Sequence, residues 1–278
     1  MFNCHTYKKM MKYILLFLVL MPLICLGQTK RFYYEVAFKL DSINVTRDIV
    51  VLDINENGNN FYSNEYLTID SLNNSSSKFK FAYPKFKSIV KWSKKDNVFE
   101  FTNNLSMSFY QFNSTITLHW NLTEEKKKIG KYSVQKAVTN YGGRTWYAWF
   151  STEIPFPFGP YVFYGLPGMI LEVYDTSDDY RFSFIQNRNY DYSIELEKIL
   201  KKYLGINRFR IEKKDWKKVQ LNFYNNPISE YKNGDAIMLK NDGSAYTAQD
   251  YKDKERAIKE GIKKYNNPIE IDEKIDYK

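Results

Sequence analysis

Apolar and polar residues alternate along most of the first two thirds of the chain. In the first such run Phe32, Tyr34, Val36, Phe38 and Leu40 fall on one face, and charged residues fall on the other. A period of two, rich in aromatic and β-branched residues, predicts half-buried strands of an antiparallel sheet. The same pattern predicts strands at 48–54, 78–83, 89–92, 98–101, 107–112, 115–122, 132–141, 144–150, 169–174 and 180–186, with asparagine-rich breaks at 55–60, 73–77 and 140–143.

Beyond Tyr190 the apolar period becomes that of a helix. The first predicted helix has Ser193 as its cap, Gly205 as its stop and an apolar face of Leu196, Ile199, Leu200, Tyr203 and Leu204. Further helices are expected at 213–224, burying Trp216, Val219 and Phe223, and at 248–265, burying Ile258, Ile262 and Tyr265. Both end in Tyr-Asn-Asn-Pro-Ile, which is either a helix stop used twice or a duplicated docking element.

These elements predict an α+β fold that is mostly β. We expect a strongly curved antiparallel sheet, a half-barrel or incomplete barrel, with two or three C-terminal helices at its concave side or end. Residues 28–190 would form the β-rich core, and residues 191–278 a helical part that packs on the same domain.

The N-terminus predicts export. Three lysines precede an uncharged run at 13–26, and a cut between Gly27 and Gln28 would remove residues 1–27 as a signal peptide. A membrane anchor is an alternative, although the run is shorter than the ~20 apolar residues that span a bilayer. Lipidation at Cys25 is another. Translation could begin at Met1, Met10 or Met11. We expect a protein of the periplasm, associated with the outer membrane, or secreted.

Composition limits both the source of stability and the classes of possible partner. Without residues 1–27 the chain has no cysteine, so its stability must come from a hydrophobic core rather than from disulfides. It keeps 38 basic against 32 acidic residues, a formal charge of +6. The basic residues lie mainly on expected helix faces of the C-terminal third. We therefore predict no nucleic-acid partner; weak attraction to anionic lipid or polysaccharide head groups is the alternative.

Candidate catalytic chemistry is sparse, and we predict no catalytic residue, metal or cofactor. The exported chain has one histidine, His119, expected to face outward, which cannot build a zinc site alone. It contains neither cysteine nor a G-x-S-x-G nucleophile motif. Asp175, Asp178 and Asp179 are interpreted as a hairpin turn rather than a calcium loop. Glu153 and Glu172, with Asp175, remain a conceivable carboxylate set for a hydrolase.

Aromatic residues concentrate between Thr145 and Tyr190. Trp146 and Trp149 would face opposite sides of one strand, so one side is core and the other could contact a ligand. We take Trp146, Trp149, Tyr161 and Tyr164 as candidate ligand contacts.

The stretch 142–175, GGRTWYAWFSTEIPFPFGPYVFYGLPGMILEVYD, follows a G-x-Y-x-x-x-K-A pattern at 130–137. Together they resemble the GLPGLI family of exported proteins from Bacteroidota-type Gram-negative bacteria. The hexapeptide is Gly165, Leu166, Pro167, Gly168, Met169 and Ile170, with methionine where the family name has leucine. Relatives often carry a cysteine at the position of Val134. Physically, the hexapeptide is either a strand entry docked tightly on the sheet or a ligand-cradling loop.

The family has no established activity, so the resemblance implies no reaction. Our hypothesis is a non-enzymatic binding or carrier protein that holds a lipid or other small apolar or mixed ligand in an aromatic-lined concavity. A carboxylate-dependent hydrolase is one alternative. A structural or accessory partner of an outer-membrane protein complex is another.

Overall fold

The computed structural model describes residues 29–75, 80, 82–106, 108–191, 196–204, 207–234 and 237–278. The predicted leader with its Gly27–Gln28 cut, the cap Ser193 and the stop Gly205 lie outside these ranges. The described strands are β1 (Thr29–Phe38), β2 (Thr46–Asn55), β3 (Gly58–Ser63), β4 (Ile89–Ser93), β5 (Val98–Leu105), β6 (Ser108–Ser114), β7 (Asn121–Ile129), β8 (Tyr132–Tyr141), β9 (Arg144–Ser151), β10 (Met169–Asp175), β11 (Tyr180–Tyr190) and β12 (Asn207–Arg210).

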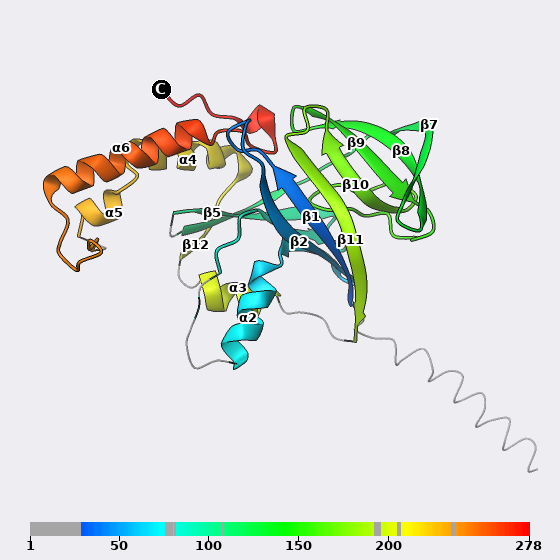
Figure 1. Cartoon of the computed structure of the whole chain (residues 1–278), viewed down its shortest axis with the longest axis horizontal. Coiled ribbons are helices and arrows are strands. Elements are labelled where there is room, and N and C mark those ends of the chain that lie inside the picture. Colours follow the sequence, from blue (N-terminus) through cyan, green and yellow to red (C-terminus); the bar gives the residue numbers. More distant parts are fainter. Residues whose placement is uncertain are drawn as a thin grey trace, which may run out of the picture.

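These strands form a single 12-stranded sheet in the order β12-β6-β5-β4-β3-β2-β1-β11-β10-β9-β8-β7. Neighbours are antiparallel except β12, which runs parallel to β6. The sheet bends strongly, and its two edges, β12 and β7, stay apart (Figure 1). The predicted mostly β fold with an incomplete antiparallel barrel is therefore confirmed.

The connection between β9 and β10, residues 152–168, lies inside the curve of the sheet; we call it the inner segment. Its Tyr161 ring packs on Phe61 of β3 and Phe101 of β5, with centroids 6.2 and 6.0 Å apart. Its Phe163 ring lies 4.7 Å from Trp146 of β9. Because six strands separate β5 from β9 in the sheet order, one segment can touch both only from the concave side. The main hydrophobic core is thus the inner segment wrapped by the sheet.

The outer face of β2 to β4 is also buried, against two helices. Helix α2 (Glu65–Ser75) and helix α3 (Leu196–Leu204) pack beside each other there (Figure 1). This second cluster contains Val51, Tyr62, Tyr66, Ile69, Ile89, Leu196 and Ile199. Burial on both faces explains the unbroken apolar run at 49–52, where alternation fails. Helix α3 therefore covers the outer face, whereas we predicted helices at the concave side or end, and α2 was not predicted.

Several strand predictions are wrong. Strand β3 begins inside the asparagine-rich stretch read as a break. Of the strand predicted at 78–83, the described residues 80, 82 and 83 are in no strand. Residues 115–120 are irregular, and β7 follows them, carrying Glu124 to Lys128. Strand β7 lies at the sheet edge with its side chains exposed or half-buried, so no hydrophobic alternation marks it.

The remaining helices extend from one end of the sheet (Figure 1). They are α4 (Trp216–Asn225), α5 (Ser229–Lys232) and α6 (Ala248–Lys264), with short 3-10 turns at Lys213–Asp215 and Ile271–Glu273. Helices α4 and α6 end at the two Tyr-Asn-Asn-Pro-Ile repeats, as predicted for a helix stop. The repeats differ in surroundings, because Asn267 is buried and Asn226 is exposed. Tyr265 is 52% exposed, contrary to prediction.

Among these described helices none has both the length and the apolar character that crossing a membrane requires.

Candidate functional site

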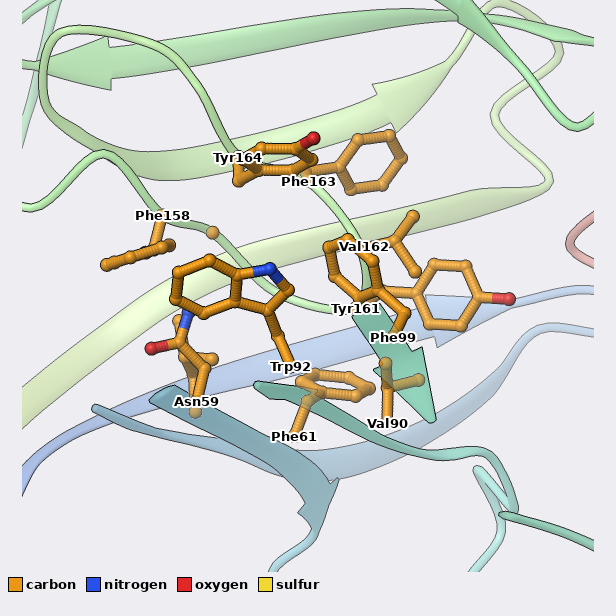
Figure 2. Close-up of a pocket in the computed structure, with 12 residues that line it drawn as sticks. Asn59, Phe61, Val90, Trp92, Phe99, Phe158, Tyr161, Val162, Phe163 and Tyr164 are labelled. Atoms are coloured by element: carbon orange, nitrogen blue, oxygen red, sulfur yellow. The ribbon is translucent and has the colours of Figure 1, made fainter. Parts of the chain in front are cut away.

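The concavity predicted to hold a ligand is largely filled by the inner segment itself. Figure 2 shows Phe158 and Tyr164 of this segment facing Trp92 and Phe61 of the sheet. The void left between them has a volume of about 10 Å³, which is room for about one water molecule. The side-chain oxygen of Asn59, buried at this void, has no hydrogen-bond partner among the described residues. This part of the concavity is core rather than a ligand site.

A larger cavity of about 290 Å³ lies at one end of the sheet, where the C-terminal segment crosses it. This volume is just below the range of about 300 to 1,000 Å³ that is usual for ligand pockets. Its apolar walls are Phe38, Leu40, Phe86, Phe101, Phe112, Tyr161, Tyr180, Trp216, Pro268 and Ile269. Its polar lining is Lys85, Lys87, Ser88, Asn103, Asn104, Lys213, Glu270 and Glu273. A ligand here would meet mostly rings, with a few charges.

Glu270 is the carboxylate that the surrounding structure holds in place. Its Oε1 atom accepts hydrogen bonds from the hydroxyl of Tyr141 at 2.6 Å and from that of Tyr161 at 2.8 Å. Its Oε2 atom lies 3.5 Å from Nζ of Lys213. Burial, and then the Glu270 charge, raises the pKa of Tyr141 and of Tyr161 well above the usual value. Both hydroxyls therefore remain protonated donors, and the carboxylate has a fixed orientation.

Tyr161 joins the inner segment to this cavity through a strained backbone. Its φ is +59°, in the left-handed region that bulky residues rarely adopt. The side chain is 6% exposed, between the rings of Phe61 and Phe101 and the Glu270 carboxylate. Such strain costs on the order of 1–3 kcal/mol and persists only where the surroundings enforce it. Here it brings the Tyr161 hydroxyl to Glu270.

Arg144 clamps the C-terminal segment that carries Glu270 onto the sheet. Its guanidinium donates to the carbonyl oxygens of Ile269 at 3.0 Å and Pro268 at 2.9 Å, and to Asn267 Oδ1 at 2.6 Å. The same group pairs with Asp175 at 2.8 Å and with Asp179 at 3.1 Å. The acidic cluster singled out in the sequence therefore has a structural role.

Asp178, the third aspartate of that cluster, pairs instead with Arg181 at 2.8 Å. It lies in the turn between β10 and β11, as the hairpin interpretation expects.

The carboxylates considered for a hydrolase do not meet. Glu153 is exposed and accepts the backbone N–H of Ser133 at 2.7 Å. Glu172 pairs with Lys127 and Arg181, whereas Asp175 on the same strand is buried against Arg144. His119 is exposed, as predicted, although it lies outside any strand.

Of the four aromatic candidates, only Tyr161 lines the larger cavity. Trp146 is fully buried and donates its Nε1–H to the carbonyl of Tyr141 at 3.0 Å. Trp149 lies on the opposite face of β9, with Lys127 Nζ 4.3 Å from its ring centroid. Tyr164 is held by two hydrogen bonds. Its hydroxyl donates to the carbonyl oxygen of Ile116 at 2.6 Å, and the Nε1–H of Trp120 donates to the carbonyl oxygen of Tyr164 at 2.8 Å.

The hexapeptide lies in the core beside the sheet and lines neither the small void nor the larger cavity. Leu166, Met169 and Ile170 are buried, and the Tyr34 hydroxyl donates to the carbonyl of Ile170 at 2.8 Å. A Cβ added at Gly168 would overlap the carbonyl oxygen of Ser151 and lie 2.6 Å from its carbonyl carbon. Gly165 has a φ of +94°, which favours glycine, and Pro167 is exposed. The geometry is that of a tightly docked strand entry.

Glu270 was not singled out from the sequence, and Lys213 was interpreted only as part of a solvated lysine-rich helix face. Glu270 stands in the charged stretch IEIDEK, which looks like a solvated surface, and Lys213 begins a lysine-rich helix face. No local signal distinguishes them, because their partners are distant in the chain.

Fold and site together define an open, curved β-sheet protein with a small aromatic cavity at one end. A family model described as "Protein of unknown function (Porph_ging)" matches residues 143–172, from the β8–β9 turn into β10. No curated protein matches the chain.

Two solved structures are similar in fold. They are titled "Structure of PNGF-II in C2 space group" and "Structure of PNGF-II in P21 space group", each 15% identical to the chain, with TM-scores of 0.49 and 0.48. Each match covers 69% of this chain and 32% or 33% of the other. The chain thus corresponds to about a third of the length of those structures.

Proposed function

We propose that this protein binds a small apolar or mixed ligand in the 290 Å³ cavity, as a non-enzymatic binding or carrier protein. The observation that carries the proposal is the cavity itself, with aromatic walls around one oriented carboxylate. The cavity opens to solvent at a rim that carries Lys85 and Lys87, so its aromatic walls face water when nothing is bound. A bound molecule with an apolar body would release that water from the ring faces, which favours binding.

We further propose that the protein acts outside the cytoplasm, in the periplasm or at the outer membrane. The support is the leader-like pattern of residues 1–27 and the resemblance of residues 142–175 to the GLPGLI family of exported proteins. The family model of unknown function matches residues 143–172, within that same stretch.

A hydrolase built on Glu153, Glu172 and Asp175 has no comparable support. Each of these carboxylates has its own partner in a different place, so no pair of them is arranged around a shared substrate.

The test is native mass spectrometry of the protein purified from the periplasm, followed by organic extraction of any bound molecule. We expect a stoichiometric small molecule on the wild type. Ser88→Phe, which puts a ring into the cavity, should remove it. Ser183→Phe is the matched control, because Ser183 is also half-buried but lines neither the void nor the cavity. An empty wild type, or a Ser88→Phe protein that is folded and still loaded, would contradict the proposal.

A further inference from the structure

Of the charged side chains that line the cavity, that of Glu270 is the least exposed to water, at 13%. Its Oε1 atom already accepts two tyrosine hydroxyls, so this oxygen is satisfied. Its Oε2 atom has Lys213 Nζ at 3.5 Å, longer than the 2.7–2.9 Å usual for a strong charge-assisted bond. A carboxylate offers about four acceptor positions. Oε2 therefore retains capacity for a hydrogen-bond donor, and a cationic donor suits it best.

Two groups of stacked aromatic rings line the cavity together with this carboxylate. In one, Phe38 stacks with Tyr180, with centroids 6.1 Å apart. In the other, Phe101 stacks with Phe112 at 5.3 Å, and Trp216 lies 6.1 Å from Phe112. Ring faces attract cations through their quadrupole and also bury apolar carbon. The Tyr180 ring already makes such a contact, with the Arg144 guanidinium 5.1 Å from its centroid.

The lysines around the cavity do not reverse this preference. Lys85 and Lys87 are exposed at the rim, where water and salt screen them. Lys213 is drawn to two carboxylates, Glu270 at 3.5 Å and Glu273 at 3.9 Å. Carboxylate oxygens of Glu270, Asp272 and Glu273 lie within 4.8 Å of one another, and Glu270 and Glu273 line the cavity, so an anion placed at Glu270 would meet like charge. The Nζ atom of Lys213 therefore lies beside the carboxylates, where the cationic group of a ligand would also bind.

We infer that the cavity ligand is an organic cation, an ammonium group on an apolar body, with the ammonium at Glu270 Oε2 and the body among the rings. This inference rests on the proposed binding function. It adds the sign of the ligand's charge and the residue that recognises it.

The experiment compares three probes of one shape on the folded protein by isothermal titration calorimetry at neutral pH: 4-phenylbutylamine, 4-phenylbutan-1-ol and 4-phenylbutyrate. We expect the amine to bind at least about tenfold more tightly than the alcohol, and the carboxylate to bind more weakly than either. Binding of the amine should weaken with added salt more than binding of the alcohol.

Two substitutions test which residues cause the preference for the amine over the alcohol. Glu270→Gln keeps the shape and an acceptor for the two tyrosines, and should bring the amine to the affinity of the alcohol. Lys213→Met removes the internal cation and should tighten amine binding several-fold. Lys214→Met is the matched control, because Lys214 is 77% exposed and pairs with Glu212 outside the cavity; it should change neither affinity.

Equal affinities for amine and alcohol would overturn the charge preference and leave the binding function standing. If the carboxylate binds most tightly, the lysines rather than Glu270 determine the charge preference of the cavity, and the inference is wrong. If none of the probes binds, this inference fails, and the binding function is decided by the native mass spectrometry of the purified protein.

Discussion

At Gly168 the chain passes so close to β9 that no side chain fits. An added Cβ would overlap the Ser151 carbonyl oxygen, and the next residue, Met169, pairs with Ser151 in the ladder. The glycine is needed for this close approach and has no left-handed φ. The hexapeptide is thus best explained by packing of the strand entry rather than by ligand contact.

Gly168→Ala should lower the free energy of unfolding by about 3 kcal/mol or more, because the overlapping atom belongs to the backbone of a central strand. Urea denaturation followed by circular dichroism measures this. Gly261→Ala is the control: Gly261 lies in α6 with no atom within 4 Å of an added Cβ, so alanine should stabilise by about 0.5–1 kcal/mol. A Gly168→Ala protein as stable as wild type would instead favour the ligand-loop interpretation.

At the residue level the sequence is informative where the signal is local. Prolines and glycines mark the stretch that contains the inner segment, and the ligand-contact role of Tyr161, which lines the cavity, stays a prediction. Glu270 escaped notice because its partners, Tyr141 and Tyr161, stand 129 and 109 residues away. A carboxylate whose role depends on such distant hydroxyls has no signature in its own neighbourhood.

Among the elements, α6 depends mainly on its own sequence. None of its side chains is fully buried, so packing contributes little. Its first turn is held by a capping box, in which Thr247 and Asp250 each accept the other's backbone N–H. Hydrogen bonds from Lys240 and Thr247 lower the pKa of Asp250 from 3.8 to about 2.

Because the folded-state pKa of Asp250 is depressed, its contribution is present above pH 3.8 and is lost as pH falls toward about 2. Amide hydrogen exchange of the first turn of α6 should therefore lose protection over that window. Asp250→Asn should show weak protection already at pH 5. Asp253→Asn, a control in the same helix that leaves the capping box intact, should behave as wild type. Unchanged protection of wild-type α6 down to pH 2 would refute this account of its N-terminus.

The elements that the sequence predicts correctly are those in which one face is more buried than the other. Strand β1 alternates buried and half-buried positions over most of its length, and β9 does so over its first half, and periodicity located both. Strand β7 buries no side chain, and helix α2 buries only Tyr66 and Ile69, so neither presents a full apolar face. Their places are set by neighbours in the sheet and by α3, which a local pattern does not contain.

At the scale of the whole molecule, the inner segment ties the two halves of the sheet together. Phe163 is 1% exposed and touches the rings of Trp146 and Trp120 on one side and Tyr161 on the other. Tyr161 in turn reaches Phe61 and Phe101. A change at Phe163 is therefore transmitted to both halves.

Phe163→Ala should cost about 3–5 kcal/mol, the usual range for removing a buried ring. Near-ultraviolet and far-ultraviolet circular dichroism should still report one coincident unfolding transition, shifted to lower denaturant. Phe209→Ala, at a ring that is 47% exposed on the edge strand β12, should cost less than about 1 kcal/mol. Two separate transitions in the Phe163→Ala protein would show that the halves fold independently.

The pairing of β1 with β11 also determines when the protein can fold. This ladder runs from Thr29 opposite Tyr190 to Phe38 opposite Tyr180, so β1, which pairs with β2 on its other edge, finds this second partner only after most of the chain has been made. Closing so long a loop carries an entropic cost before any contact offsets it, and sheets dominated by distant pairings fold in about milliseconds to seconds rather than microseconds. Until then the edge of β1 that faces β11 is unpaired and open to pairing with another copy of the chain.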